Sequence, residues 1–143
     1  MSAAGTPFGD FAIEVRVYYE DTDAAGVVYY ANYLRFMERA RNEWLRARLG
    51  GPHELALKIR VLFAVRSVAL EFRAPARLDD VLRVTANPVS IRGASLTFQQ
   101  DCWRKGERVC AGKIDVVCVD AESFAPRRLP RELMQILAEV SAS

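Results

Sequence analysis

Residues 30–49 read YANYLRFMERARNEWLRARL, and they carry the strongest periodic pattern in the chain. Apolar side chains recur there at helical spacing, namely Tyr33, Phe36, Met37, Ala40, Trp44, Leu45 and Leu49. The opposite face is rich in arginine. Because Gly50, Gly51 and Pro52 follow and break helices, the pattern predicts one long amphipathic helix that ends near residue 49.

Most of the remaining chain has the composition of β-strands. The predicted strands are residues 12–19, 60–73, 81–92, 94–104 and 108–119. Short connections favour antiparallel pairing, and Pro88 indicates an edge position or a bulge. We therefore expect an α+β architecture in which a five-stranded antiparallel sheet curls around the helix and buries its apolar stripe. Since such a sheet has open edges, we also expect dimerisation through an edge strand.

The length and composition predict one folded domain. The chain has 143 residues, of which 51% are hydrophobic. We expect a flexible tail over residues 1–11 and a single domain over residues 12–140, ending in a short helix or a loose tail. Twenty basic and 18 acidic residues give a net charge of +2, which is too balanced for a strongly basic nucleic-acid binder.

The single histidine, His53, excludes several kinds of site within one chain. A three-histidine zinc site, an HExxH helix and a two-Cys, two-His zinc finger all need more histidines. A histidine-dependent triad would have to use His53, which follows Gly51 and Pro52 in an expected loop. The three cysteines, spaced by eight, match no metal or redox motif and are expected to be small apolar residues on adjacent strands. We therefore expect no metal and no cofactor.

The densest chemistry lies just before the long helix, in residues 18–30, YYEDTDAAGVVYY. Three acids fall within four residues, and an apolar run follows them directly. Acids and threonine are common in turns and at helix N-termini, so a purely structural role is one interpretation. The apolar run and Gly26 favour another, in which a carboxylate, unpaired helix amides and apolar walls form a pocket.

This stretch resembles the signature of hotdog-fold acyl-CoA thioesterases of the 4-hydroxybenzoyl-CoA thioesterase family, most of all the bacterial subgroup associated with the Tol-Pal envelope system. The matching residues are 15–23, 26–29, 31–34, 38–41, 65–67 and 74–80. The resemblance covers about residues 12–135. It implies the hotdog fold, a homodimer or a homotetramer built as a dimer of dimers, and hydrolysis of a short-chain or aromatic acyl-CoA to the free acid and CoA.

The resemblance also implies roles for individual residues. Asp23 is expected to be catalytic, as a nucleophile or as a general base that activates water. The backbone amide of Tyr30 is expected to donate to the oxyanion. Gly26, Val28 and Tyr29 are expected to bind substrate, together with Ser67, Arg92 and Ser95. For Ser67 a structural role, and for Arg92 a solvated turn position, stay open as alternatives.

Position 30 departs from the resembled subgroup, which usually has histidine there. A backbone amide survives this change, whereas any imidazole role does not. Two other functions stay open: a non-catalytic acyl-binding or scaffolding hotdog module, and an enzyme like the hotdog enoyl-CoA hydratases. We further expect a cytoplasmic protein without a secretory signal or integral membrane segment, with envelope or lipid-synthesis proteins as possible partners. The acyl chain and its carrier, CoA or acyl carrier protein, are not fixed by the sequence.

Overall fold

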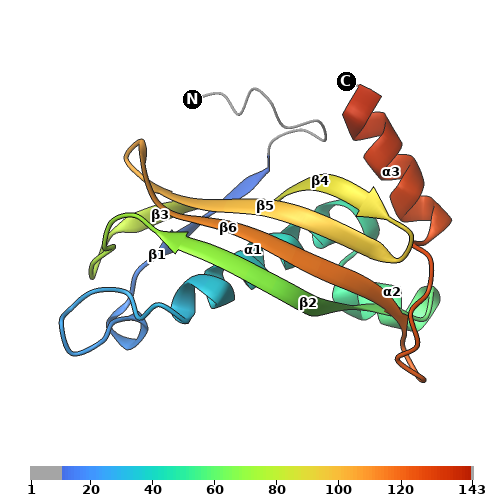
Figure 1. Cartoon of the computed structure of the whole chain (residues 1–143), viewed down its shortest axis with the longest axis horizontal. Coiled ribbons are helices and arrows are strands. Elements are labelled where there is room, and N and C mark those ends of the chain that lie inside the picture. Colours follow the sequence, from blue (N-terminus) through green and yellow to red (C-terminus); the bar gives the residue numbers. More distant parts are fainter. Residues whose placement is uncertain (1–10, 143) are drawn as a thin grey trace.

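Helix α1, Asn32–Leu49, lies along the concave face of an antiparallel sheet in the computed structural model, which describes residues 11–142 (Figure 1). The strands are β1 (Ala12–Arg16), β2 (Val61–Phe72), β3 (Val81–Thr85), β4 (Asn87–Arg92), β5 (Ser95–Arg104) and β6 (Glu107–Asp120). Their order is β1-β3-β5-β6-β2, and β4 also pairs with β5. The predicted fold class is confirmed. The predicted tail, residues 1–11, lies almost wholly outside the described residues.

The sheet has six strands where the sequence analysis predicts five. The predicted strand 81–92 divides at Ala86 into β3 and β4, which pair with opposite ends of β5. The register shifts between Pro88 and Ser90, so the predicted bulge at Pro88 is present. The first strand is also shorter than predicted, because the chain leaves the sheet after Arg16 and forms a 3-10 turn, η1 (Tyr19–Asp21). This early departure places the acidic turn beside the start of α1.

The core lies between α1 and the sheet. The apolar stripe of α1 is buried from Tyr33 to Leu45, and every second residue of β5 is buried against it. Removing this surface from water is the main source of stability. All three cysteines are free and buried on β5 and β6, as predicted.

One polar side chain in the core fixes α1 on the sheet. Gln100 of β5 is fully buried, and its Nε2 donates to the carbonyls of Met37 (2.9 Å) and Thr85 (3.0 Å). Its Oε1 accepts a hydrogen bond from Arg41 at 3.0 Å. Since a buried amide without partners would destabilise the fold, these bonds specify how far α1 lies along β5.

The segment around His53 is a helix, and the expected loop there is wrong. Gly50 ends α1 with a left-handed φ of 84°, and Pro52 then begins a second helix, α2 (Pro52–Lys58). His53 is therefore an exposed helical residue and not a loop residue. Proline at the first helical position stops one helix and starts the next, which explains the misinterpretation.

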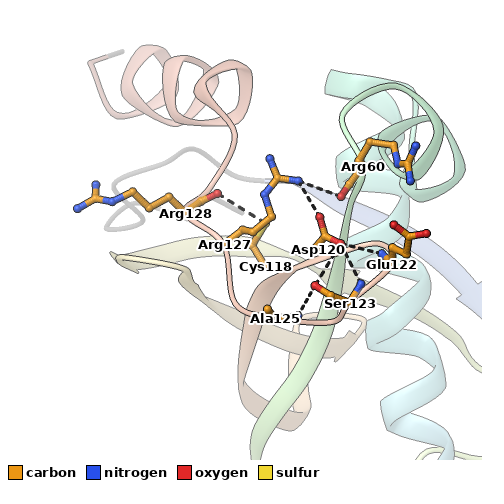
Figure 2. Close-up of polar contacts among 8 residues, drawn as sticks. All are labelled: Arg60, Cys118, Asp120, Glu122, Ser123, Ala125, Arg127 and Arg128. Carbon is orange, nitrogen blue, oxygen red and sulfur yellow. Dashed lines mark hydrogen bonds and ion pairs between the residues drawn. The ribbon is translucent and has the colours of Figure 1, made fainter.

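Asp120, at the end of β6, organises the turn that leads to the C-terminal helix (Figure 2). Its Oδ2 accepts bonds from the amides of Glu122 (3.0 Å) and Ser123 (2.9 Å), which lower the pKa of the carboxyl group. Arg127 pairs with Oδ1 of Asp120 at 3.4 Å and donates to the carbonyl of Arg60 at 3.1 Å. These contacts tie the connection to the start of β2.

Helix α3, Arg131–Ala142, completes the domain and confirms a helix as the chain's last described element. Leu133 and Leu137 are buried, and α3 contacts α1. No helix within residues 11–142 combines the length and the apolar character needed to cross a membrane.

Candidate functional site

The acidic turn forms a small hairpin between η1 and α1. The amide of Tyr29 donates to the carbonyl of Asp21, and the amide of Asp23 donates to the carbonyl of Val27, each at 2.9 Å. Gly26 closes the tip with a left-handed φ of 78°, and its amide donates to the carbonyl of Asp23 at 2.9 Å. The hairpin therefore holds Asp23 near its tip, on a short and internally bonded segment.

One carboxylate oxygen of Asp23 orients the side chain. Oδ1 accepts bonds from the amides of Ala25 (2.9 Å) and Val27 (3.4 Å). Among the described residues, nothing donates to Oδ2. The turn-forming role and the catalytic role are thus compatible, since one oxygen stabilises the loop and the other is left for substrate or water.

Asp23 faces a cavity of about 400 Å³ at one end of α1. Its lining consists of Asp23, Val27, Val28, Tyr30, Tyr33, Phe72, Arg73, Ala74 and Pro75. The rings of Tyr30 and Phe72, 61% and 51% exposed, lie 6.3 Å apart edge to face and form one wall. Val28 is buried beneath it, with its amide bonded to the carbonyl of Ala76 at 2.8 Å. A carboxylate at an aromatic-walled cavity is the arrangement expected of a binding site.

Tyr30, two residues before α1, and Tyr33, in its first turn, both line this cavity. Within residues 11–142, the amide N–H of Tyr30 has no acceptor, whereas the amide of Tyr29 bonds to Asp21. Free amides at a helix N-terminus, reinforced by the helix dipole, bind anions and oxyanions. Tyr33 is buried, and burial raises the pKa of its phenol to about 12, so this ring stays neutral.

The predicted substrate residue Tyr29 does not line this cavity. Its ring lies against that of Tyr30, with centroids 4.7 Å apart. A hydrogen bond with Tyr30 raises the pKa of the Tyr29 phenol. Tyr29 therefore contacts the site through its neighbour.

Ser67, Arg92 and Ser95 are not brought to the Asp23 cavity within one chain. The hydroxyl of Ser67 donates to Asp115 at 2.8 Å. Hydrogen bonds from Thr97 and then Ser67 lower the pKa of the Asp115 carboxyl group. Arg92 and Ser95 pair across the β4–β5 turn. Phe72 lies beside Cys110, which pairs with Cys102 of β5. Ser95 is seven residues from Cys102 along β5. At the usual strand rise this separation is about 24 Å.

Sequence reasoning missed the wall that β2 contributes. Phe72, Arg73 and Pro75 are more than 40 residues from Asp23 in the chain, and only the fold brings them to the cavity. The guanidinium of Arg73 is oriented by Glu71, with Nη2 to Oε1 at 2.7 Å. The one local signal was an apolar strand end followed by arginine and proline.

Comparison with known proteins identifies the relatives of this arrangement. Residues 17–137 match the model of the thioesterase-like superfamily. The acyl-CoA thioester hydrolase YbgC of Escherichia coli O6:H1 is 45% identical over 125 residues, covering 87% of this chain and 92% of that protein. The acyl-CoA thioesterase YbgC of Haemophilus influenzae is 39% identical over 123 residues, covering 86% and 90%.

Solved structures agree. A probable thioesterase from Bartonella henselae has a TM-score of 0.81 and 32% identity, covering 85% of this chain and all of that one. A DHNA-CoA thioesterase from Staphylococcus aureus has a TM-score of 0.85 at 20% identity, covering 93% and 91%, and supports the hotdog fold alone. The family and enzyme class that the sequence analysis predicts are thereby confirmed. The chain belongs to the thioesterase-like superfamily and is a close homologue of the YbgC acyl-CoA thioester hydrolases.

Proposed function

We propose that this chain hydrolyses a short-chain or aromatic acyl-CoA to the free acid and CoA, with Asp23 as its catalytic carboxylate. The observation that supports the proposal is one cavity lined by both Asp23 and Tyr30, where the Tyr30 amide has no acceptor within residues 11–142. A carboxylate and an oxyanion donor are the two groups that thioester hydrolysis requires, since a thiolate is a good leaving group.

In the general-base form of the reaction, Oδ2 of Asp23 takes a proton from water as the water oxygen attacks the thioester carbonyl. The carbonyl oxygen becomes an oxyanion and receives the hydrogen bond of the Tyr30 amide. The carbon–sulfur bond then breaks, the thiolate of CoA leaves, and the proton held by Asp23 passes to the thiolate or to solvent. In the nucleophilic form, Asp23 itself attacks, a mixed anhydride forms as the thiolate leaves, and water cleaves the anhydride.

The walls favour a compact or aromatic acyl group. Tyr30, Tyr33 and Phe72 supply ring faces and edges, which pack well against flat groups. Arg73, which lines the cavity, is a candidate partner for the phosphates of CoA, because a guanidinium matches phosphate geometry. Acyl carrier protein is the alternative carrier.

A second copy of the chain would complete the site. Strand β2 is an edge strand of 12 residues, and its middle residues, 64–69, are all exposed. Long apolar edges of this kind are normally paired. Antiparallel pairing of two β2 strands about a two-fold axis would bring the Val61 end of one copy beside the Phe72 end of the other. Arg92 and Ser95 lie toward the Val61 end of β2. In the dimer, the partner's copies of these two residues would therefore be the ones positioned to contact the nucleotide of CoA.

The compartment and the protein partners are part of this proposal. Three free, buried cysteines suit a reducing compartment, and we propose the cytoplasm. A dimer of dimers, and association with envelope or lipid-synthesis proteins, stay predictions from the family resemblance.

The direct test is the variant Asp23→Asn. The carboxamide oxygen of the new side chain can still accept the amide bond of Ala25, so the turn is kept while the basic and nucleophilic oxygen is lost. We expect kcat for thiol release from a panel of short, long and aromatic acyl-CoAs to fall by about 10²–10⁴-fold. The matched control is Asp79→Asn, the same change at an exposed turn acid outside the cavity.

Two outcomes would contradict the proposal. An Asp23→Asn variant with full activity would remove Asp23 from the mechanism, and a wild-type chain that releases no thiol from any acyl-CoA would favour the acyl-binding module. The hydratase alternative normally needs an aspartate–histidine pair, and His53 does not line the Asp23 cavity. Hydration of an enoyl-CoA without thiol release would nevertheless establish it.

A further inference from the structure

Asp21, the first acid of the Asp-x-Asp pair, is the least exposed charged residue of the acidic turn. Only 8% of it is exposed, whereas Glu20 and Asp23 are exposed residues. Burying a carboxylate is costly unless its oxygens are hydrogen-bonded. Both carboxylate oxygens of Asp21 accept hydrogen bonds, which offset the cost of burying it.

The two carboxylate oxygens of Asp21 connect the two sides of the cavity. Oδ2 accepts the amide of Tyr18 at 2.8 Å, which closes the η1 turn. Oδ1 accepts a bond from Nδ2 of Asn32 at 3.0 Å, and Asn32 is the first residue of α1. The carbonyl of Asp21 in turn accepts the amide of Tyr29. Asp21 thus bonds both to the η1 turn, which precedes Asp23, and to residues 29 and 32, which flank Tyr30.

Asn32 completes the connection from the other side. Its own amide donates to the carbonyl of Tyr29 at 2.8 Å, while its side chain holds Asp21. Tyr30 lies between these two bonded residues, and Asp23 lies two residues after Asp21. The Asp21–Asn32 hydrogen bond therefore joins the arm that carries Asp23 to the segment that carries Tyr30, at the open end of the hairpin.

We propose that Asp21 and Asn32 are positioning residues that fix the Asp23 carboxylate relative to the oxyanion-donating amide of Tyr30. The inference rests on the proposed hydrolase function. Neither residue lines the Asp23 cavity, so their effect is on geometry and not on substrate contact. Acyl transfer needs the base and the oxyanion donor at a fixed separation. Weakening the Asp21–Asn32 hydrogen bond is therefore expected to lower kcat and to leave KM nearly unchanged.

The test exploits charge. Asn32→Asp places two carboxylates face to face, where they repel each other unless one is protonated. We expect kcat of this variant at pH 8 to fall at least about tenfold. Relative to wild type, it should recover at acid pH, where a proton restores the hydrogen bond. The other charged or titratable residues that line the hollow beside Asp21 are Glu14, Arg16, Tyr18, Glu20 and Arg39, which the variant leaves in place.

The double variant, Asp21→Asn with Asn32→Asp, reverses the polarity of the bond. The carboxamide now at position 21 keeps an acceptor for the Tyr18 amide and offers its NH₂ to the carboxylate now at position 32. Activity at pH 8 should therefore return to within a few-fold of wild type. Asn42→Asp makes the same change further along α1, and its activity relative to wild type should not vary with pH. Circular dichroism melting of each variant separates lost positioning from lost folding.

Three results would overturn the inference: an Asn32→Asp variant as active as wild type at pH 8, a loss that appears in KM alone, or a double variant no better than the single one. Failure of the proposed function is visible separately, because it appears in the wild-type chain as absence of thiol release before any variant is compared.

Discussion

Tyr30, which lines the Asp23 cavity, has two chemically distinct groups that could act there. Its amide is without an acceptor among the described residues, and its ring forms a wall with Phe72. The amide would act on the oxyanion and the ring on the acyl group. Because the amide is part of the backbone, replacing the side chain separates the two roles.

We expect Tyr30→Ala to raise KM for aromatic acyl-CoAs while kcat changes far less than the roughly 10²–10³-fold typical of a lost oxyanion donor. The wall is removed, but the amide remains. Steady-state kinetics with one aromatic and one short aliphatic acyl-CoA measure both effects. Tyr30→Phe keeps the ring and serves as the control. A collapse of kcat in both variants would show that the phenol hydroxyl takes part in chemistry.

At this scale, the sequence indicates only what is local. Asp23, Gly26 and Tyr30 lie within eight residues of one turn, and Asp23 and Tyr30 line one cavity, while their catalytic roles stay predictions. It could not find Arg73 or the Asp21–Asn32 bond. Arg73 reaches the cavity only because β2 ends beside the hairpin, and the bond depends on where α1 begins. Both follow from tertiary packing, which no local pattern encodes.

Among the elements, the distance between α1 and the sheet is set at Gly112 of β6. A Cβ atom there would lie 2.8 Å from Cδ2 of Leu70 and 3.0 Å from Cε of Met37. The missing side chain lets Met37 of α1 pack directly over β6. Since the position of α1 also positions the Tyr30 amide, this packing supports the site.

Gly112→Val should lower the free energy of unfolding by about 1–3 kcal/mol, because the branched side chain overpacks the Met37–Leu70 contact. Urea denaturation measures the change. The control is Ala111→Val, an adjacent position whose side chain points to the other face of the strand. An equal effect of both substitutions would mean that strand propensity, and not packing against α1, is responsible.

Periodicity predicted α1, β5 and β6 well, since each buries one continuous face. Periodicity failed where no repeating pattern of apolar residues marks an element or its boundary. The division at Ala86 depends on two partners for different ends of β5, and α2 is a seven-residue helix too short for a periodic signal. Such boundaries are decided by pairing and capping.

For the whole molecule, the exposed side of β2 links the fold to the site. Val65, Val68 and Phe72 are exposed along this edge strand, and Phe72 also lines the Asp23 cavity. Tyr29 and Tyr30 add exposed aromatic surface beside them. Exposed apolar residues along an edge strand that leads to a cavity are what the proposed second copy would cover.

Val68→Lys tests this coupling between assembly and catalysis. Val68 lies in the middle of the edge and is 42% exposed, and a charge buried there between two copies would be unpaired. We expect sedimentation velocity at low micromolar concentration to show a dimer or tetramer for wild type and a monomer for the variant. In the monomer, kcat/KM should fall, since the cavity lacks its partner's wall.

Leu78→Lys, at a position 45% exposed outside β2, is the matched control and should stay assembled and active. A folded, monomeric Val68→Lys variant with full activity would show that one chain holds the complete site, whereas an undiminished oligomer would place the interface on another surface.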